Sequence, residues 1–166
     1  MEQIGSTLYL KGLGSLSKND TVHFDQAGTI RIQDQVFHFN PAVTNHIEID
    51  GEGTPARLIV SNHQDQTNVT VGANSARVTT PSGRDSNATL FASGFQRIDV
   101  LLDGDNTSAS FQGDTNSVDH VTIKPTHAWL EADQFTGYVR GADQVDTVST
   151  DRVDTTVLYD LSLIHI

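Results

Sequence analysis

The sequence predicts an all-β fold, a β-solenoid of the parallel β-helix type. Three observations support this prediction: short segments that alternate apolar and polar residues, gaps rich in Gly, Asn, Asp and Ser, and a repeat of about 50 residues. With 166 residues the chain is long enough for one domain with a hydrophobic core. Short strands with frequent turns also occur in an antiparallel β-sandwich, which is the alternative architecture.

Alternation of apolar and polar side chains recurs along the chain and predicts half-buried strands. The segment from Thr126 to Ala132 also has a helix N-cap residue and good helix formers, but its alternation and its place in the repeat assign it to a strand. The positions predicted to point inward are Leu8, Leu10, Val22, Phe24, Ile30, Ile32, Ile47, Ile49, Leu58, Val60, Val69, Val71, Ile98, Val100, Val121, Ile123, Val157 and Tyr159.

The repeat rests on four pairs of similar segments, which are separated by offsets of 47 to 52 residues. We predict that residues 1–160 form one domain of about three units plus the first strand of a fourth, with two coils in each unit. Stacked neighbouring repeats of the same chain then bury the apolar side chains. The aligned segments start at Ile47 and Ile98, Gly94 and Gly141, Asn68 and His120, and Ala109 and Val157.

Turn residues recur just before the predicted strands. Asp20, Asn106 and Asp146 are each followed directly by Thr. An Asp or Asn side chain accepts hydrogen bonds from nearby backbone amides, and β-branched Thr favours the strand that follows. We therefore expect these side chains to cap the turns between strands.

Charge and composition exclude several classes of protein. The net charge is −11, so we expect no binding to nucleic acid, whose phosphates it would repel. The chain has no cysteine, which excludes disulfides and thiolate metal sites. It contains no apolar run of about 18 residues, so no membrane span is expected.

Several short motifs resemble elements of long bacterial surface and secreted proteins that carry tandem units of about 50 residues. Asp154–Asp160 resembles their "DTATLYDS" element, Gly94–Ile98 resembles "GFDRV", and Lys18–Val22 resembles "GNDTV". The resemblance implies an extracellular or cell-surface location as part of a longer exported protein. These proteins in turn resemble, distantly, haemolysin-type calcium-repeat proteins.

That second resemblance implies calcium as a cofactor, and the acidic turn with Asp103 and Asp105 supplies the candidate ligands. The sequence departs from the family here, because the nonapeptide Gly-Gly-x-Gly-x-Asp-x-apolar-x is absent. Apart from calcium, no cofactor is expected.

The last six residues, 161–166, read Leu-Ser-Leu-Ile-His-Ile. They resemble the translation of a transposase-end sequence used in preparing sequencing libraries. We expect them to be a non-native tail and the natural chain to continue after Asp160.

No catalytic motif is present: neither His-Glu-x-x-His nor Gly-x-Ser-x-Gly occurs. The sequence therefore predicts a non-catalytic structural or adhesive segment. One alternative is a carbohydrate-active β-helix enzyme, because the repeat would stack the carboxylates of Glu48, Asp99 and Asp146.

The other alternative is a binding module for calcium or for a glycan, and a surface glycan or protein is the expected partner. Trp129, Tyr138 and Phe135 are the residues predicted to offer a sugar-stacking platform.

Overall fold

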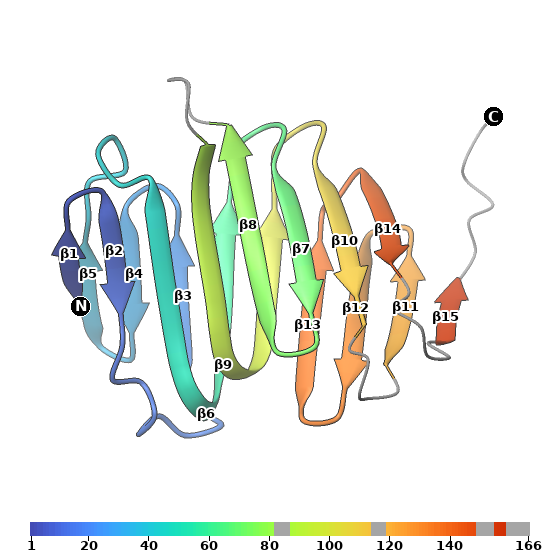
Figure 1. Cartoon of the computed structure of the whole chain (residues 1–166), viewed down its shortest axis with the longest axis horizontal. Helices are drawn as coiled ribbons and strands as arrows, with labels where there is room; N and C mark the ends of the chain where they lie inside the picture. Colours follow the sequence, from blue (N-terminus) through green and yellow to red (C-terminus); the bar gives the residue numbers. More distant parts are fainter. Residues whose placement is uncertain (82–86, 114–118, 149–154, 159–166) are drawn as a thin grey trace.

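The chain forms a β-solenoid of about three turns, which confirms the predicted fold class (Figure 1). The structure is a computed structural model and describes residues 1–81, 87–113, 119–148 and 155–158. The described residues contain 15 strands and no helix. They therefore include no long apolar helix of the kind that crosses a membrane.

The strands lie in two layers, which we call the front layer and the back layer (Figure 1). Two long strands, β6 and β9, belong to both layers, because their first halves pair in the front and their second halves pair in the back. Their bounds are β6 His46–Asn62 and β9 Asn87–Leu102. The other front strands are β1 Glu2–Ile4, β2 Thr7–Leu10, β7 Asn68–Gly72, β8 Ser75–Pro81, β10 Ser108–Gln112 and β14 Gln144–Val148. The other back strands are β3 Thr21–Asp25, β4 Thr29–Ile32, β5 Gln35–His38, β11 His120–Lys124, β12 His127–Ala132, β13 Phe135–Arg140 and β15 Thr155–Leu158.

Successive coils pair in parallel, as expected for a solenoid. Ile47 of β6 lies opposite Leu8 of β2 and Leu90 of β9 in the front layer. Further along the chain, Asn68 of β7 lies opposite Ser108 of β10, and the two side chains are hydrogen-bonded across a sequence separation |i−j| of 40. This separation is the length of one coil.

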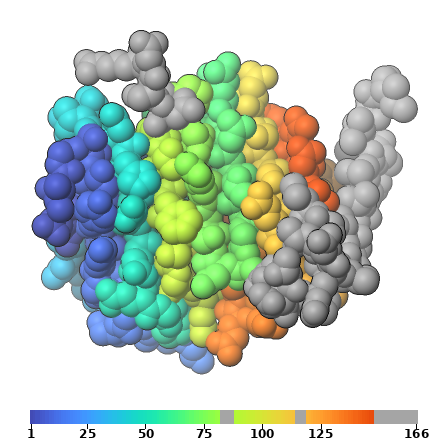
Figure 2. All heavy atoms as spheres, in the orientation of Figure 1, coloured from blue at the N-terminus to red at the C-terminus, as the bar shows by residue number. Residues whose placement is uncertain are grey.

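The predicted spacing of two coils per repeat unit is wrong. Asn68 pairs with Ser108 and not with His120, the residue that the predicted repeat aligned with it. The reason is that the chain doubles back within each coil, through the antiparallel meanders β3–β4–β5, β7–β8–β9 and β11–β12–β13. Figure 2 shows the result on the front face: yellow-green β9 lies between cyan β6 and the green strands β8 and β7, although β7 and β8 precede β9 in the sequence.

The long strands change layer at a bend where two glycines meet. Gly51 of β6 and Gly94 of β9 approach so closely that a Cβ on Gly51 would overlap the carbonyl oxygen of Gly94. Gly94 also has a φ of +72°, which favours glycine. The register between β6 and β9 shifts at this bend, between Asp50 and Arg57. The two glycines thus allow the backbones of β6 and β9 to stay in contact where both strands pass from the front layer to the back layer.

The core lies between the two layers, as the alternation predicts. Most of the positions predicted to point inward are buried, and Ile32 is partly buried against them. The side chains of Val157 and Tyr159 lie outside the described residues, as does the segment 161–166. The strand predicted around Trp129 is present as β12. The confirmed positions are Leu8, Leu10, Val22, Phe24, Ile30, Ile47, Ile49, Leu58, Val60, Val69, Val71, Ile98, Val100, Val121 and Ile123.

An acidic side chain caps the turn before β3 as predicted, at Asp20, and Asp143, which was not among the predicted residues, makes a similar contact. Asp20 accepts a hydrogen bond from the backbone N–H of Ser17 at 2.7 Å, and this bond is the first cause of a lowered pKa of Asp20. Asp143 accepts one from the backbone N–H of Thr107 at 2.8 Å. The second contact joins residues 36 apart, so turn capping also ties neighbouring coils together.

Candidate functional site

The three carboxylates predicted to stack do not come together. Glu48 and Asp146 both lie in the front layer, but β9, β8, β7 and β10 separate their strands. Asp99 lies in the back layer, opposite Tyr138. The predicted repeat of about 50 residues would have aligned the three carboxylates. The observed coil is shorter, with paired positions 40 residues apart at Asn68 and Ser108, so the three carboxylates lie at different points of the solenoid.

The calcium candidates lie at an exposed corner between β9 and β10. Asp103 faces His63 at 3.4 Å. The backbone N–H of Asp105 donates to Asp65 Oδ1 at 2.9 Å, so the Asp65 carboxylate is used in holding the turn. In the ranges that the structure describes, no group of three or more His, Asp or Glu side chains gathers as a metal site would require.

The predicted aromatic platform is divided between two places. Trp129 and Tyr138 are neighbours on the outer side of the back layer. His127 stacks on Trp129, with ring centroids 5.6 Å apart, and the Lys124 ammonium lies 5.1 Å from the Trp129 ring centroid. Phe135, in contrast, is buried and faces a groove at the edge of the solenoid.

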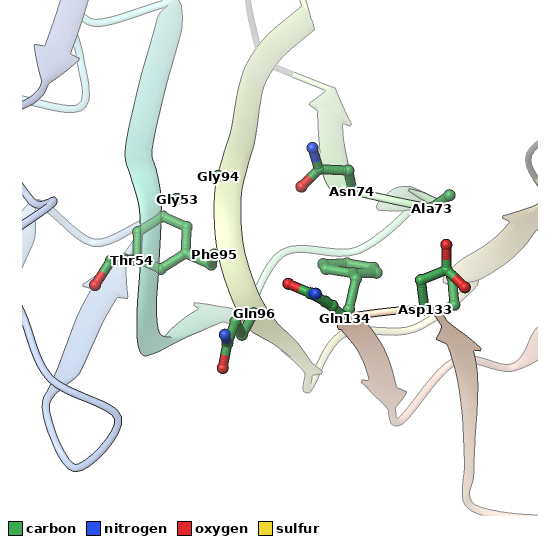
Figure 3. A pocket seen from close by; sticks show the side chains of 11 residues that line it. Gly53, Thr54, Ala73, Asn74, Gly94, Phe95, Gln96, Asp133 and Gln134 are labelled. Carbon is green, nitrogen blue, oxygen red and sulfur yellow. The ribbon is translucent and has the colours of Figure 1, made fainter. Parts of the chain in front are cut away.

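This groove begins in a hollow of about 370 Å³ beside the bend of β6 and β9 (Figure 3). Phe95 and Phe135 line its apolar part, and both side chains are otherwise buried in the core. Its polar part comes from the side-chain amides and carboxylate of the turns and of β9, namely Asn74, Gln96, Asp133 and Gln134. We call this hollow the amide end. It combines an apolar surface with several hydrogen-bonding groups.

A second hollow, of about 740 Å³, continues from the first along the same edge. The two share five lining residues, from Gln96 and from the segment 132–135. Lys18, Arg57 and Arg97 line the second hollow on the side of β3, β6 and β9, and we call this part the basic end. The two hollows together form what we call the edge groove.

At the basic end, two guanidinium groups hold one buried carboxylate. Asp99 is fully buried although it points to the outer side of the back layer. Its Oδ2 is bound by Arg57, through Nε and a terminal nitrogen, and its Oδ1 accepts a hydrogen bond from Arg97 Nε at 2.8 Å. A buried carboxylate requires such partners, because its desolvation is otherwise costly.

The Arg97 side chain is held from a second direction by an aromatic ring. Its guanidinium carbon lies 5.9 Å from the centroid of the Tyr138 ring. Tyr138 in turn lies 5.6 Å from the ring of His127. Arg97 is therefore fixed by a carboxylate and a ring before any ligand arrives.

His23 lies near these cations on β3, and its pKa is lowered. Partial burial is the main cause, and the charges of Arg31 and Arg57 add to it. Unfolded His23 gains a proton below about pH 6.5, while the folded form resists protonation. The stability that His23 contributes is thus complete above pH 6.5 and is lost as the pH falls toward its folded pKa.

We therefore expect His23→Gln to reduce the fall in melting temperature between pH 7.5 and pH 5.0, because glutamine does not titrate. Thermal melts by circular dichroism at both pH values measure this. His38→Gln, at an exposed position of β5, is the matched control. An unchanged pH dependence in the His23 variant would contradict the assignment.

Sequence reasoning missed most of the edge groove. Asn74 and Gln134 stand in turns, where amide residues are ordinary. Arg57 and Arg97 become neighbours only through the parallel register of β6 and β9. Arg57 and Arg97 are 40 residues apart, so a repeat length of 40 residues would have predicted that they are neighbours.

No protein-family model matches the chain, and no curated protein and no solved structure matches it.

Proposed function

We propose that this β-solenoid is a non-catalytic adhesive segment of an exported surface protein, and that it binds a glycan in the edge groove. The observation that carries the proposal is the composition of the amide end. There, two phenylalanine rings and four amide or carboxylate side chains line one hollow of about 370 Å³.

The chemistry of a sugar ring fits this composition. A pyranose has an apolar face of C–H groups and a rim of hydroxyls that both donate and accept hydrogen bonds. Amide side chains such as Asn74, Gln96 and Gln134 offer a donor and an acceptor each, while Asp133 accepts only. Binding sites for small polar ligands commonly join an apolar surface to a few placed polar groups.

The fold supports an adhesive role because it holds the groove on a strand and on two-residue turns between paired strands. Gln96 is part of β9, and Asp133 and Gln134 form the turn between the paired strands β12 and β13. Asn74 stands in the equally tight turn between β7 and β8. A site on such elements loses little conformational entropy when a ligand binds.

To test the proposal, the protein is screened against an array of oligosaccharides of four to eight sugar units, and the best ligand is titrated by calorimetry. We expect the double variant Asn74→Ala, Gln134→Ala to weaken binding roughly 10-fold or more, because each lost neutral hydrogen bond is worth about 1 kcal/mol.

Gln35→Ala removes an exposed amide from β5, away from the groove, and serves as the control. It is expected to bind as the unaltered protein does. Equal affinity of all three proteins would place binding elsewhere. Shorter fragments in the recovered oligosaccharide, detected by mass spectrometry, would contradict a non-catalytic role.

A further inference from the structure

We infer that the glycan is acidic, and that the basic end of the edge groove binds its anionic group, a carboxylate or a sulfate. This inference rests on the proposed function and adds the chemical class of the ligand. It follows from the way in which Arg57, Arg97 and Lys18 are placed.

The arginine pair keeps free donors after binding Asp99. Arg57 and Arg97 are register neighbours on adjacent strands. Asp99 engages Arg57 through Nε and one terminal nitrogen, and Arg97 through Nε. Within the described ranges, the two terminal nitrogens of Arg97 make no hydrogen bond to the protein. The Arg97 side chain is about half exposed, at 47%, so these N–H groups are open to the groove. Paired N–H donors of this kind bind carboxylate and sulfate oxygens in bidentate fashion.

The charges along the groove are separated. Lys18, Arg57 and Arg97 lie on the side of β3, β6 and β9, whereas Glu131 and Asp133 belong to the hairpin of β12 and β13. Asp99 neutralises only one of the two guanidinium charges, and Lys18 adds a third cation. On the side of β3, β6 and β9, Lys18, Arg57, Arg97 and Asp99 therefore carry a net positive charge, and they face Glu131 and Asp133 across the hollow.

The continuity of the groove determines how the ligand lies. Because Gln96 and residues 132–135 line both hollows, one oligosaccharide can occupy both ends at once. An uncharged sugar then contacts the amide end, and the anionic substituent of the next sugars meets Arg97 and Lys18. The basic end thus selects acidic over neutral chains with the same backbone.

Three polymers with one backbone test the inference: dextran, carboxymethyl-dextran and dextran sulfate. Binding of the full chain to each is measured by calorimetry in 50 mM and in 500 mM NaCl. We expect at least 10-fold tighter binding of an anionic polymer than of dextran at low salt. The difference should shrink in 500 mM NaCl, because salt screens exposed charges. The ratio between the two anionic polymers distinguishes carboxylate from sulfate.

A charge-reversal pair locates the effect. Lys18→Glu is expected to weaken binding of the preferred anionic polymer about 5- to 10-fold and to leave dextran binding unchanged. Lys11→Glu makes the same change in net charge, but Lys11 lies over Tyr9 at the front layer, outside the groove. It is expected to alter neither affinity by more than about twofold.

Each outcome is decisive. Equal affinity for dextran and both anionic polymers overturns the acidic class and leaves glycan binding intact. Equal losses in the Lys18 and Lys11 variants overturn the location at the basic end. Failure of all three polymers to bind, together with an array without ligands, overturns the proposed function itself.

Discussion

Replacing Phe111 by alanine is expected to lower the free energy of unfolding by about 3 to 5 kcal/mol, the range for a buried phenylalanine in a packed core. Phe111 is fully buried and is among the largest side chains of the core. It points inward from β10, opposite Val71 of β7 and Thr147 of β14. The cavity would therefore open where three coils meet.

Phe91 provides the matched control for this experiment. It stands in the same layer on β9, but its side chain points outward and is 40% exposed. Phe91→Ala should change the free energy of unfolding by no more than about 0.5 kcal/mol. Urea denaturation followed by circular dichroism measures both variants. Similar losses in the two would mean that the layers do not pack around Phe111 as described.

The second large effect is expected at Asp99. In the double variant Arg57→Met, Arg97→Met, the aliphatic stems remain but both positive charges are lost. The Asp99 carboxylate is then buried without a cationic partner, and we expect a destabilisation of about 2 to 4 kcal/mol. The upper end of the range for buried pairs is not expected, because both arginine side chains are partly exposed to water.

Adding Asp99→Asn to the double variant should restore most of the lost stability, because the buried charge is then gone. The measurement is again urea denaturation at pH 7. If the triple variant is as unstable as the double variant, the loss comes from packing of the arginine side chains and not from the unpaired carboxylate. The comparison thus separates the cost of the unpaired Asp99 charge from the cost of lost arginine packing.

The alternation of apolar residues was sufficient to predict the strands and the core, because side-chain direction in a strand depends only on local sequence. Leu58 and Ile98 are examples, since both are buried as predicted. The order of the strands was not predictable in the same way. Strands in an antiparallel meander and strands in a simple coil show the same alternation of apolar and polar residues. The sequence pattern therefore does not reveal that β7, β8 and β9 pair antiparallel within one layer.

The site was less predictable than the fold, because it depends on register. Asp99 was singled out from the sequence as a possible acid of an enzyme, but the register places it between Arg57 and Arg97. Phe135 was grouped with Trp129 and Tyr138, although its side chain points to the opposite face of the back layer from theirs. A shift of one residue exchanges the two faces of a strand, so tertiary contacts had to decide these assignments.

The doubling back of the chain makes the resistance of the solenoid to stretching uneven. Between β1 and β15, the strands that the structure describes, a plane drawn between β6 and β9 is crossed once, in the connection from β6 to β7. A plane on the other side of β9 is crossed three times, by the connections from β6 to β7, from β8 to β9 and from β9 to β10. Under tension along the long axis, one chain segment connects the two sides of the first plane, whereas three chain segments connect the two sides of the second plane.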